Sequence, residues 1–458
     1  MSKTHFLKSL LLAPRFASLL VLACAGPCLA QGRCNEDESA AVRLARDTGG
    51  SVSATPETST IDPRQQLQDL VALSLRRSNS MGAIRLLTLA AEADVEEAKA
   101  ARLPTVNLVG SGAYVGNVQP GQDTVKGSQA RGSLMVSAPL FDFGRITKMT
   151  EWRTQLAEVA KLGQSAAEEQ LALQTISLAL DRSRYVLQAQ VYSQYVRRMS
   201  CLVDSLEVIT KADRGRASEL VQAQKSLQQA DLSYEGSLSA LRQTEVRLRR
   251  FVGEQLPPSA PMSNVLARLP DLNEMQQDIL SAPDINQASA TAKASRSYAE
   301  SVLAGQKPSV NLTVGTNSTV GTGKETDWNG GVQVNIPLYQ PGADATLMAA
   351  HRRAQSALLQ RDDAIEAKRY RLLEVYEVAS SALDRARRVV DILRNSDKLR
   401  SATLQQWQQL GKRSLFDVMG AEGDYYANRV AHVNALFDAE QAVALMWSMG
   451  RGVQTPLR

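Results

Sequence analysis

Apolar side chains recur every seven residues over long stretches of this 458-residue chain. One register contains Leu220, Leu227, Tyr234, Leu241 and Leu248, and another contains Leu358, Ile365, Leu372, Ala379, Ala386 and Leu393. Before the first register, Tyr195, Met199, Leu202, Leu206 and Ile209 are spaced alternately by four and three residues. A sustained period of about 3.5 residues indicates helices that pack through a coiled-coil seam. We therefore predict seams that include Leu202, Leu206, Leu220, Leu227, Leu241, Leu248, Leu358, Ile365 and Leu372.

The stretches that carry these seams are long and rarely interrupted. Residues 145–212 contain no proline and a single glycine, Gly163, and neither residue type occurs between Gly342 and Gly411. At about 1.5 Å per residue, a helix over 145–212 is about 100 Å long. We predict one helical hairpin over residues 145–250 and a second over 342–448. Two antiparallel hairpins of this length form a rod.

Four shorter segments alternate between apolar and polar residues and predict β-strands at 104–118, 132–140, 308–320 and 331–339. Polar, glycine-containing loops at 119–128 and 321–327 connect them as two hairpins. Strands of about 9–11 residues cross a bilayer when tilted, and aromatic residues near the strand ends suit an interfacial girdle. Strand patterning alone leaves a second interpretation open, in which two ordinary hairpins pack on the helices.

The chain contains this plan twice. Pro104–Leu108 recurs as Pro308–Leu312, 204 residues later, and Pro139–Phe141 resembles Pro337–Tyr339, 198 residues later. A unit of about 200 residues exceeds the length of a solenoid repeat and indicates a duplicated, domain-sized module. We predict a first repeat over residues 62–260, a second over 261–450, and a C-terminal tail over 451–458. The predicted fold is mainly α with a small β part.

The first thirty residues have the pattern of a secretory signal peptide. Basic residues precede an apolar run over 16–25, and a small residue, Ala30, marks the predicted cleavage site. An alternative is a lipoprotein signal in which Cys24 carries the lipid. The mature segment 31–61 is predicted to be irregular. Cleavage leaves Cys34 and Cys201, which either pair or stay free in an oxidising compartment.

Composition argues against several other classes of protein. After cleavage no run of about 18 apolar residues remains to form a transmembrane helix. The net charge is only +5, and the densest basic cluster, over 242–250, lies on a heptad helix, which does not favour a nucleic-acid-binding surface. The three histidines lie apart from any second metal ligand, and no nucleophile or phosphate-loop motif is complete. We expect no enzyme activity, no cofactor and no metal site.

If the four strands span a membrane, one chain cannot close a barrel, because the smallest single-chain barrels have eight strands. Lipid does not tolerate an open sheet edge. Several chains must then each donate four strands, and their rods would bundle as a hollow cylinder beneath the barrel. Such an architecture conducts cargo.

From about Leu67 to Gly450 the sequence resembles the TolC-like outer-membrane efflux proteins. The resemblance rests on the duplication, on Pro139–Arg145 at the start of the first long helix, and on Gly411–Val418. It implies a homotrimer with a twelve-stranded barrel in outer-membrane lipid and a long periplasmic helical extension. It also implies docking to a periplasmic adaptor (membrane fusion) protein and to an inner-membrane transporter, either an ABC transporter or a proton-driven pump.

The resemblance also implies a gate at the periplasmic tip. Arg413 and Asp417 resemble the family's basic and acidic positions in the second half, and Ser218 and Glu219 resemble a hydroxyl-plus-acid pair in the first. This chain departs from the pattern in three places. Gly420 replaces a second acidic residue, Gln408 replaces a tyrosine, and Asp213 occupies the usual glycine position, with Gly215 two residues on.

The predicted function is passive export through the outer membrane. Pro139–Arg145 and the string Gly215–Leu220 look more like the type I protein-secretion branch than like the multidrug-efflux branch, which is the alternative. A hypothesis of another class is a periplasmic structural coiled coil without a channel. It explains the heptads and the signal peptide, but neither the alternating segments nor their duplication.

Overall fold

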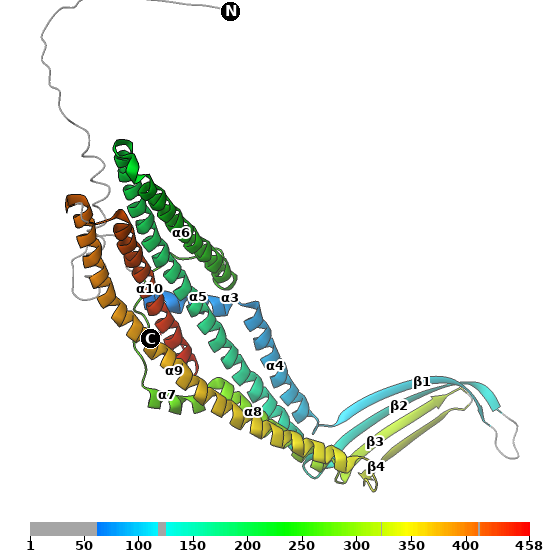
Figure 1. Ribbon diagram of the computed structural model, residues 1–458. Helices are drawn as coiled ribbons and strands as arrows, with labels where there is room; N and C mark the ends of the chain where they lie inside the picture. The colour runs from blue at the N-terminus through cyan, green and yellow to red at the C-terminus, as the bar shows by residue number, and fades with distance from the viewer. Residues whose placement is uncertain (1–61, 118–124, 322, 411–412) are drawn as a thin grey trace, which may run out of the picture.

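The computed structural model describes residues 62–117, 125–321, 323–410 and 413–458. The molecule is elongated, with a helical body at one end and a narrow sheet at the other (Figure 1). The predicted signal peptide, the segment 31–61 and the alternative lipid site at Cys24 lie outside the described residues. In the parts of the chain that the structure describes, no helix combines the length and hydrophobicity needed to cross a bilayer.

The order of elements repeats, as the duplicated sequence predicted. The first set is α3 (Pro63–Arg77), α4 (Asn79–Ala100), β1 (Thr105–Asn117), β2 (Val125–Phe141), α5 (Arg145–Ala212), η1 (Arg214–Arg216) and α6 (Ala217–Val252). The second set is α7 (Leu272–Asp278), η2 (Ile279–Ser281), α8 (Pro283–Gly305), β3 (Ser309–Val320), β4 (Glu325–Asn335), α9 (Ala343–Leu410) and α10 (Leu415–Ser448). A short helix, η3 (Thr455–Leu457), ends the chain. The division into domains at residues 260 and 450 stays a prediction.

The four strands form one antiparallel sheet in the order β1-β2-β3-β4. The central pair joins the two halves of the chain, with Val136 opposite Val314, and the register shifts between Pro139 and Phe141. Proline has no N–H to donate to a neighbouring strand, which fits an irregularity at this point. β1 and β4 are the two edges of the sheet, and neither pairs with a further strand in the described residues.

The predicted bounds of two strands were wrong. β2 begins at Val125 instead of 132, and β4 spans Glu325–Asn335 instead of 331–339. After Val125, the first residues of both strands are mostly polar or charged, so the hydrophobic pattern hides them. Backbone pairing extends the ladder, with Asn117 opposite Val125 and Thr319 opposite Glu325.

Both long helices begin at a glycine in the left-handed region, Gly144 (φ 84°) and Gly342 (φ 87°), 198 residues apart like the neighbouring proline motifs. At the first of them, the Asp142 carboxylate accepts hydrogen bonds from the backbone N–H groups of Gly144 (3.0 Å) and Ile146 (2.6 Å). A side chain with a Cβ is strained in this backbone conformation, and the carboxylate satisfies N–H groups that lack helical partners. This explains why the Pro139–Arg145 motif starts α5.

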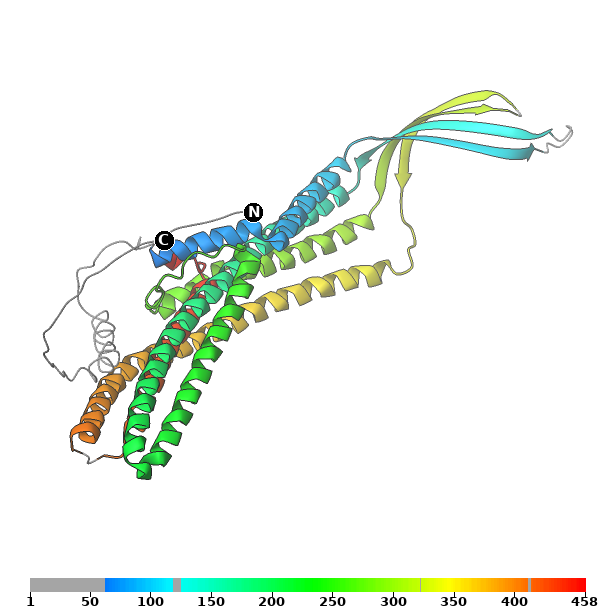
Figure 2. The ribbon, with the colours of Figure 1, turned by 90° about the horizontal axis from the view of Figure 1, so that it is seen from above.

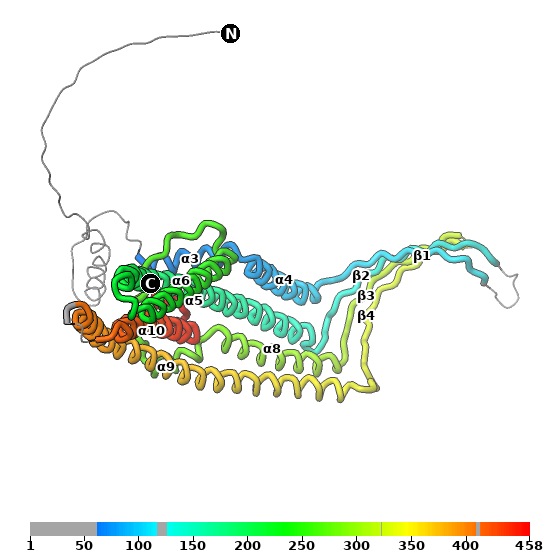
Figure 3. Tube along the Cα trace, turned by 45° about the horizontal axis from the view of Figure 1, so that its top comes forward, coloured from blue at the N-terminus to red at the C-terminus, as the bar shows by residue number. Residues whose placement is uncertain are grey.

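α5 and α9, with 68 residues each, are the longitudinal elements of the body. Each packs against the helix that returns from its far end, α6 or α10, and against the helix that precedes its strands, α4 or α8. Figure 3 shows α8 and α9 running side by side toward the sheet. The predicted rod is therefore confirmed for the single chain, with two helical hairpins at the end opposite the sheet (Figure 2).

Several predicted seam residues are buried within the chain: Leu202 (5 % exposed), Leu206 (0 %), Leu248 (0 %) and Leu372 (0 %). Leu220, Leu227, Leu241 and Ile365 are partly buried. Leu358 is 45 % exposed and lies outside any seam of the single chain. The predicted seam also left out a second column of buried residues on α6, made of Ala223, Ala230, Ser237 and Thr244. These small side chains allow α6 to approach α5 closely.

The largest core lies at mid-length, where α3, α7 and the chain terminus pack around α5, α9 and α10. Polar side chains, buried or partly buried, fix the linker between the two halves. Gln66 donates to the Pro258 carbonyl at 2.7 Å and accepts from the Ala260 N–H at 3.1 Å. Arg182 donates to the Pro257 carbonyl at 2.7 Å and forms an ion pair with Glu245 at 2.9 Å.

Cys201, on α5, is disulfide-bonded. Its partner lies outside the described residues, where the other three cysteines of the sequence are found. The free-thiol alternative for Cys201 is therefore wrong. Cleavage after Ala30 would leave Cys34 as the only possible partner within the chain, and that pairing stays a prediction.

Candidate functional site at the tips of the helical hairpins

The predicted gate residues lie at the two turns farthest from the sheet (Figure 1). In the first turn, Asp213 accepts a hydrogen bond from the Gly215 N–H at 3.0 Å. Arg216 lies 3.7 Å from the Asp213 carboxylate and 4.0 Å from that of Glu219. The family that the sequence resembles usually has a glycine at this position. Here the Asp213 side chain caps the turn instead.

Glu219 lies in the first turn of α6, where the helix dipole favours a negative charge. Its Oε2 atom is buried and receives no hydrogen bond from any residue that the structure describes. Ser218, next to it, is exposed at the same turn. A buried carboxylate oxygen without a hydrogen-bond donor is costly. Arg216 Nη1 lies 4.0 Å from this oxygen, too far to donate to it, so the position suits a donor supplied by another chain.

The second turn is capped by Ser414 and Asp417, which form a reciprocal capping box at the start of α10. Ser414 Oγ accepts from the Phe416 N–H at 2.9 Å, and Asp417 Oδ2 accepts from the Ser414 N–H at 3.3 Å. The Asp417 carboxylate therefore stabilises the helix start in addition to the predicted role in the bore. In the sequence, the spacing Ser414-x-x-Asp417 resembles a capping box and could have indicated this helix start.

Arg413 stays within its own turn in the single chain. Its Nε donates to Gln406 Oε1 at 3.1 Å, and its Nη1 lies 3.8 Å from Asp417 Oδ2. Among the described residues, the structure does not bring Arg413 together with Ser218 or Glu219. A gate contact between them requires a neighbouring chain and stays a prediction.

Directly behind the two turns, the hairpins share an apolar cluster of Met199, Leu202, Val203, Leu206, Ala223, Leu415, Val418 and Met419. This tip cluster contains residues of α5, α6 and α10. It couples the first turn to the second, because a shift of α10 moves side chains that also pack on α5 and α6.

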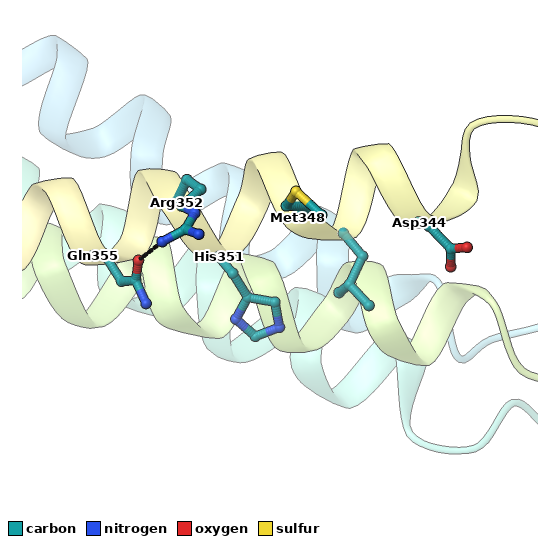
Figure 4. Close-up of a pocket in the computed structure, with 6 residues that line it drawn as sticks. Asp344, Met348, His351, Arg352 and Gln355 are labelled. Atoms are coloured by element: carbon teal, nitrogen blue, oxygen red, sulfur yellow. Dashed lines mark hydrogen bonds between the residues drawn. The ribbon is translucent and has the colours of Figure 1, made fainter.

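A shallow pocket lies at the opposite end, on the first turns of α9 beside the sheet. Asp344, Met348, His351 and Gln355 point outward along the helix, and Arg352 donates to Gln355 Oε1 at 3.0 Å (Figure 4). These side chains do not converge on one point. Within the described ranges, no group of His, Cys, Asp and Glu residues is arranged to hold a metal ion.

Glu440 on α10 is a buried carboxyl group in the mid-length core, with 1 % of the residue exposed. Burial raises its pKa from 4.5 to about 8, although the nearby backbone N–H groups of Leu266 and Val265 lower it in part. The folded protein therefore holds a proton here that the unfolded chain loses. We predict that the free energy of unfolding falls as the pH rises from 4.5 to about 8.

Glu440→Gln should reduce this fall in thermal stability, because the amide does not ionise. The exposed Glu377→Gln on α9 is a matched control that should leave the pH dependence unchanged. Circular-dichroism melting across this pH range measures the effect. Equal pH dependence in the wild type and Glu440→Gln would contradict the assignment.

Known proteins share both the sequence pattern and this architecture. Residues 275–450 match the family described as "Outer membrane efflux protein". The "Cation efflux system protein CusC" of Escherichia coli O6:H1 (strain CFT073) is 23 % identical over 421 residues, 85 % of this chain and 86 % of CusC.

Solved structures show the same fold over most of the chain. The crystal structure of CusC superposes with a TM-score of 0.74 at 19 % identity, covering 87 % of this chain and 95 % of CusC. The Campylobacter jejuni CmeC outer membrane channel gives a TM-score of 0.74 at 14 % identity, over 87 % of this chain and 90 % of CmeC. Residues 275–450 of the chain thus match the outer-membrane efflux protein family, and the chain over most of its length has the fold of TolC-like outer-membrane channels.

Proposed function

We propose that three copies of this chain form an exit duct through the outer membrane. The observation that carries this proposal is the four-stranded sheet, which ends in two unpaired edges. Its apolar side chains are exposed in the single chain, as Leu108 (79 %), Tyr114 (74 %) and Trp328 (83 %) illustrate. A sheet of this kind is stable in lipid only when its edges pair in a closed barrel.

The size of the barrel supports three chains. Two copies would give eight strands, and side chains fill the interior of an eight-stranded barrel. Three copies give twelve strands and leave room for a bore. The family resemblance independently implies a trimer.

The helical body continues the duct on the periplasmic side. On α9, apolar side chains stay exposed in the single chain: Met348, Leu358, Leu359, Tyr370, Val378 and Ile392. Association of three bodies would remove such side chains from water, at about 25 cal/mol per Å² of apolar surface. This interface would also bury Leu358, which the single chain leaves exposed.

The turns at the tip form the gate of this duct. Arg413 of one chain would reach Glu219 or Ser218 of a neighbour and supply the donor that Glu219 Oε2 lacks. Asp417 from each chain would form a ring of carboxylates in the bore. A periplasmic adaptor docking at these turns would shift the hairpins and open the passage toward an inner-membrane transporter.

The relatives favour small cargo over secreted protein. The curated relatives that match most of the chain are named cation efflux system proteins. The sequence motifs favoured the type I protein-secretion branch over the multidrug-efflux branch, and the names of the relatives favour the reverse order. We propose efflux of ions or small molecules, with an ABC or proton-driven pump supplying the energy.

Reconstitution and deletion together test this function. The purified protein should form pores in planar bilayers, and deletion of its gene should sensitise cells to metal ions or antibiotics without reducing secreted protein. Loss of one secreted protein with unchanged sensitivity would restore the type I assignment. A protein that stays in the periplasmic fraction and forms no pores would support the structural coiled coil.

A further inference from the structure

Three helices of the hairpin region meet at one buried carboxylate, that of Glu422 on α10. The Glu422 side chain is 0 % exposed, and its Oε1 accepts a hydrogen bond from Arg198 Nε of α5 at 2.9 Å. Its Oε2 lies 3.5 Å from Nη1 of Arg400 on α9. The two arginine side chains are only 16 % and 14 % exposed. One carboxylate thus joins the first hairpin to both helices of the second.

Aromatic side chains enclose this ion cluster and restrict its movement. The Arg400 guanidinium lies over the Tyr425 ring, 4.3 Å from its centroid, and the rings of Tyr195 and Tyr426 lie 4.9 Å apart. The Tyr195 hydroxyl lies next to the backbone beside Glu422, because a Cβ added at Gly423 would be in van der Waals contact with it at 3.4 Å. The carboxylate therefore has little freedom to choose other partners.

Stability alone does not account for charges at this place. The tip cluster packs on one side, and a second apolar cluster of Val191, Tyr425, Tyr426 and Val430 packs on the other. Apolar side chains of similar volume usually stabilise such a site as well as a buried ion pair does. An ion cluster differs from an apolar contact in being directional, so it fixes one arrangement of the helices against sliding and rotation.

We propose that Glu422 is the positioning residue of the gate. By holding Arg198 and Arg400 together, it fixes the second hairpin against α5 in the closed arrangement. Glu422 lies only five residues beyond Asp417, about one and a half helical turns, so loosening α10 here displaces the turn that carries Arg413 and Asp417. Opening the channel therefore requires this contact to break. The proposal rests on the channel function proposed above.

Glu422→Gln tests the proposal directly, because it keeps the side-chain shape and removes the charge. The matched control is Asp424→Asn, which makes the same charge change at an exposed position two residues away on the same helix. In planar bilayers, Glu422→Gln should raise the mean single-channel conductance and the fraction of time spent open. Asp424→Asn should conduct like the wild type. Yield of assembled protein from the outer membrane verifies folding.

Arg198→Gln removes the other end of the contact and decides the question if Glu422→Gln does not assemble. It should open the channel in the same direction, and the double variant should conduct no more than Glu422→Gln alone, because the contact is already broken. Conductance equal to that of the wild type in assembled Glu422→Gln, or in Arg198→Gln, would overturn the proposal. A wild-type protein that forms no pore would instead overturn the channel function itself.

Discussion

Leu248→Asp should abolish accumulation of the assembled protein in the outer membrane. Leu248 is fully buried on α6, in the mid-length core where the heptad register predicted it. An aspartate there leaves an ionised carboxylate without a partner in an apolar environment. Such a charge destabilises a protein by about 3–5 kcal/mol, a large part of the stability of a typical domain.

Val246→Asp makes a comparable change two residues away, at a side chain that is 63 % exposed. This control should assemble at nearly the wild-type level, because its carboxylate stays in water. Quantitative immunoblots of outer-membrane fractions measure both variants. Equal yields would show that the coiled-coil register is wrong.

Arg413→Ser combined with Glu219→Ala should raise the conductance of the resting channel and admit large antibiotics to cells. A single exposed ion pair contributes about 0.2–1 kcal/mol, so three symmetric contacts would hold the gate with about 1–3 kcal/mol. An adaptor can overcome a free energy of this size, and removing both partners should shift the resting channel toward open states.

Asp417→Asn tests the proposed carboxylate ring separately from the proposed contact between Arg413 and Glu219. It should mainly lower cation preference and block by divalent ions, because a ring of carboxylates acts on the passing ion. The amide can no longer act as the charged member of the capping box, so a modest loss of stability at the start of α10 should accompany it.

A double Arg413/Glu219 variant that conducts like the wild type would show that these residues do not form the gate.

The long helices and the duplication were predictable from the sequence because they leave strong periodic signals. Proline-free stretches with a seven-residue period define α5 and α9, and the repeated Pro104 and Pro308 motifs mark the start of both sheet halves. The strand starts at Val125 and Glu325 were missed because polar residues there join the ladder through their backbone. Hydrophobic patterning does not report backbone pairing.

The tip shows a different limit of sequence reasoning. Arg413 and Glu219 lie at the hairpin turns, but the predicted contact between them requires another chain, which a single sequence does not arrange in space, and it stays a prediction. The Glu422 cluster was missed because its three charged members lie on helices separated by up to 224 residues. Each of them alone looks like a solvated charge on a heptad helix. Only the packing of α10 against both α5 and α9 makes them neighbours.

The mass of the detergent-solubilised protein is the most direct test of the proposal that three chains form the duct. Native mass spectrometry of protein extracted from the outer membrane should give a single species of three mature chains. In the proposed duct, three copies would supply the twelve strands that close the sheet edges left open by β1 and β4. A monomer in the outer-membrane fraction would contradict the account, because four strands cannot close a barrel in lipid.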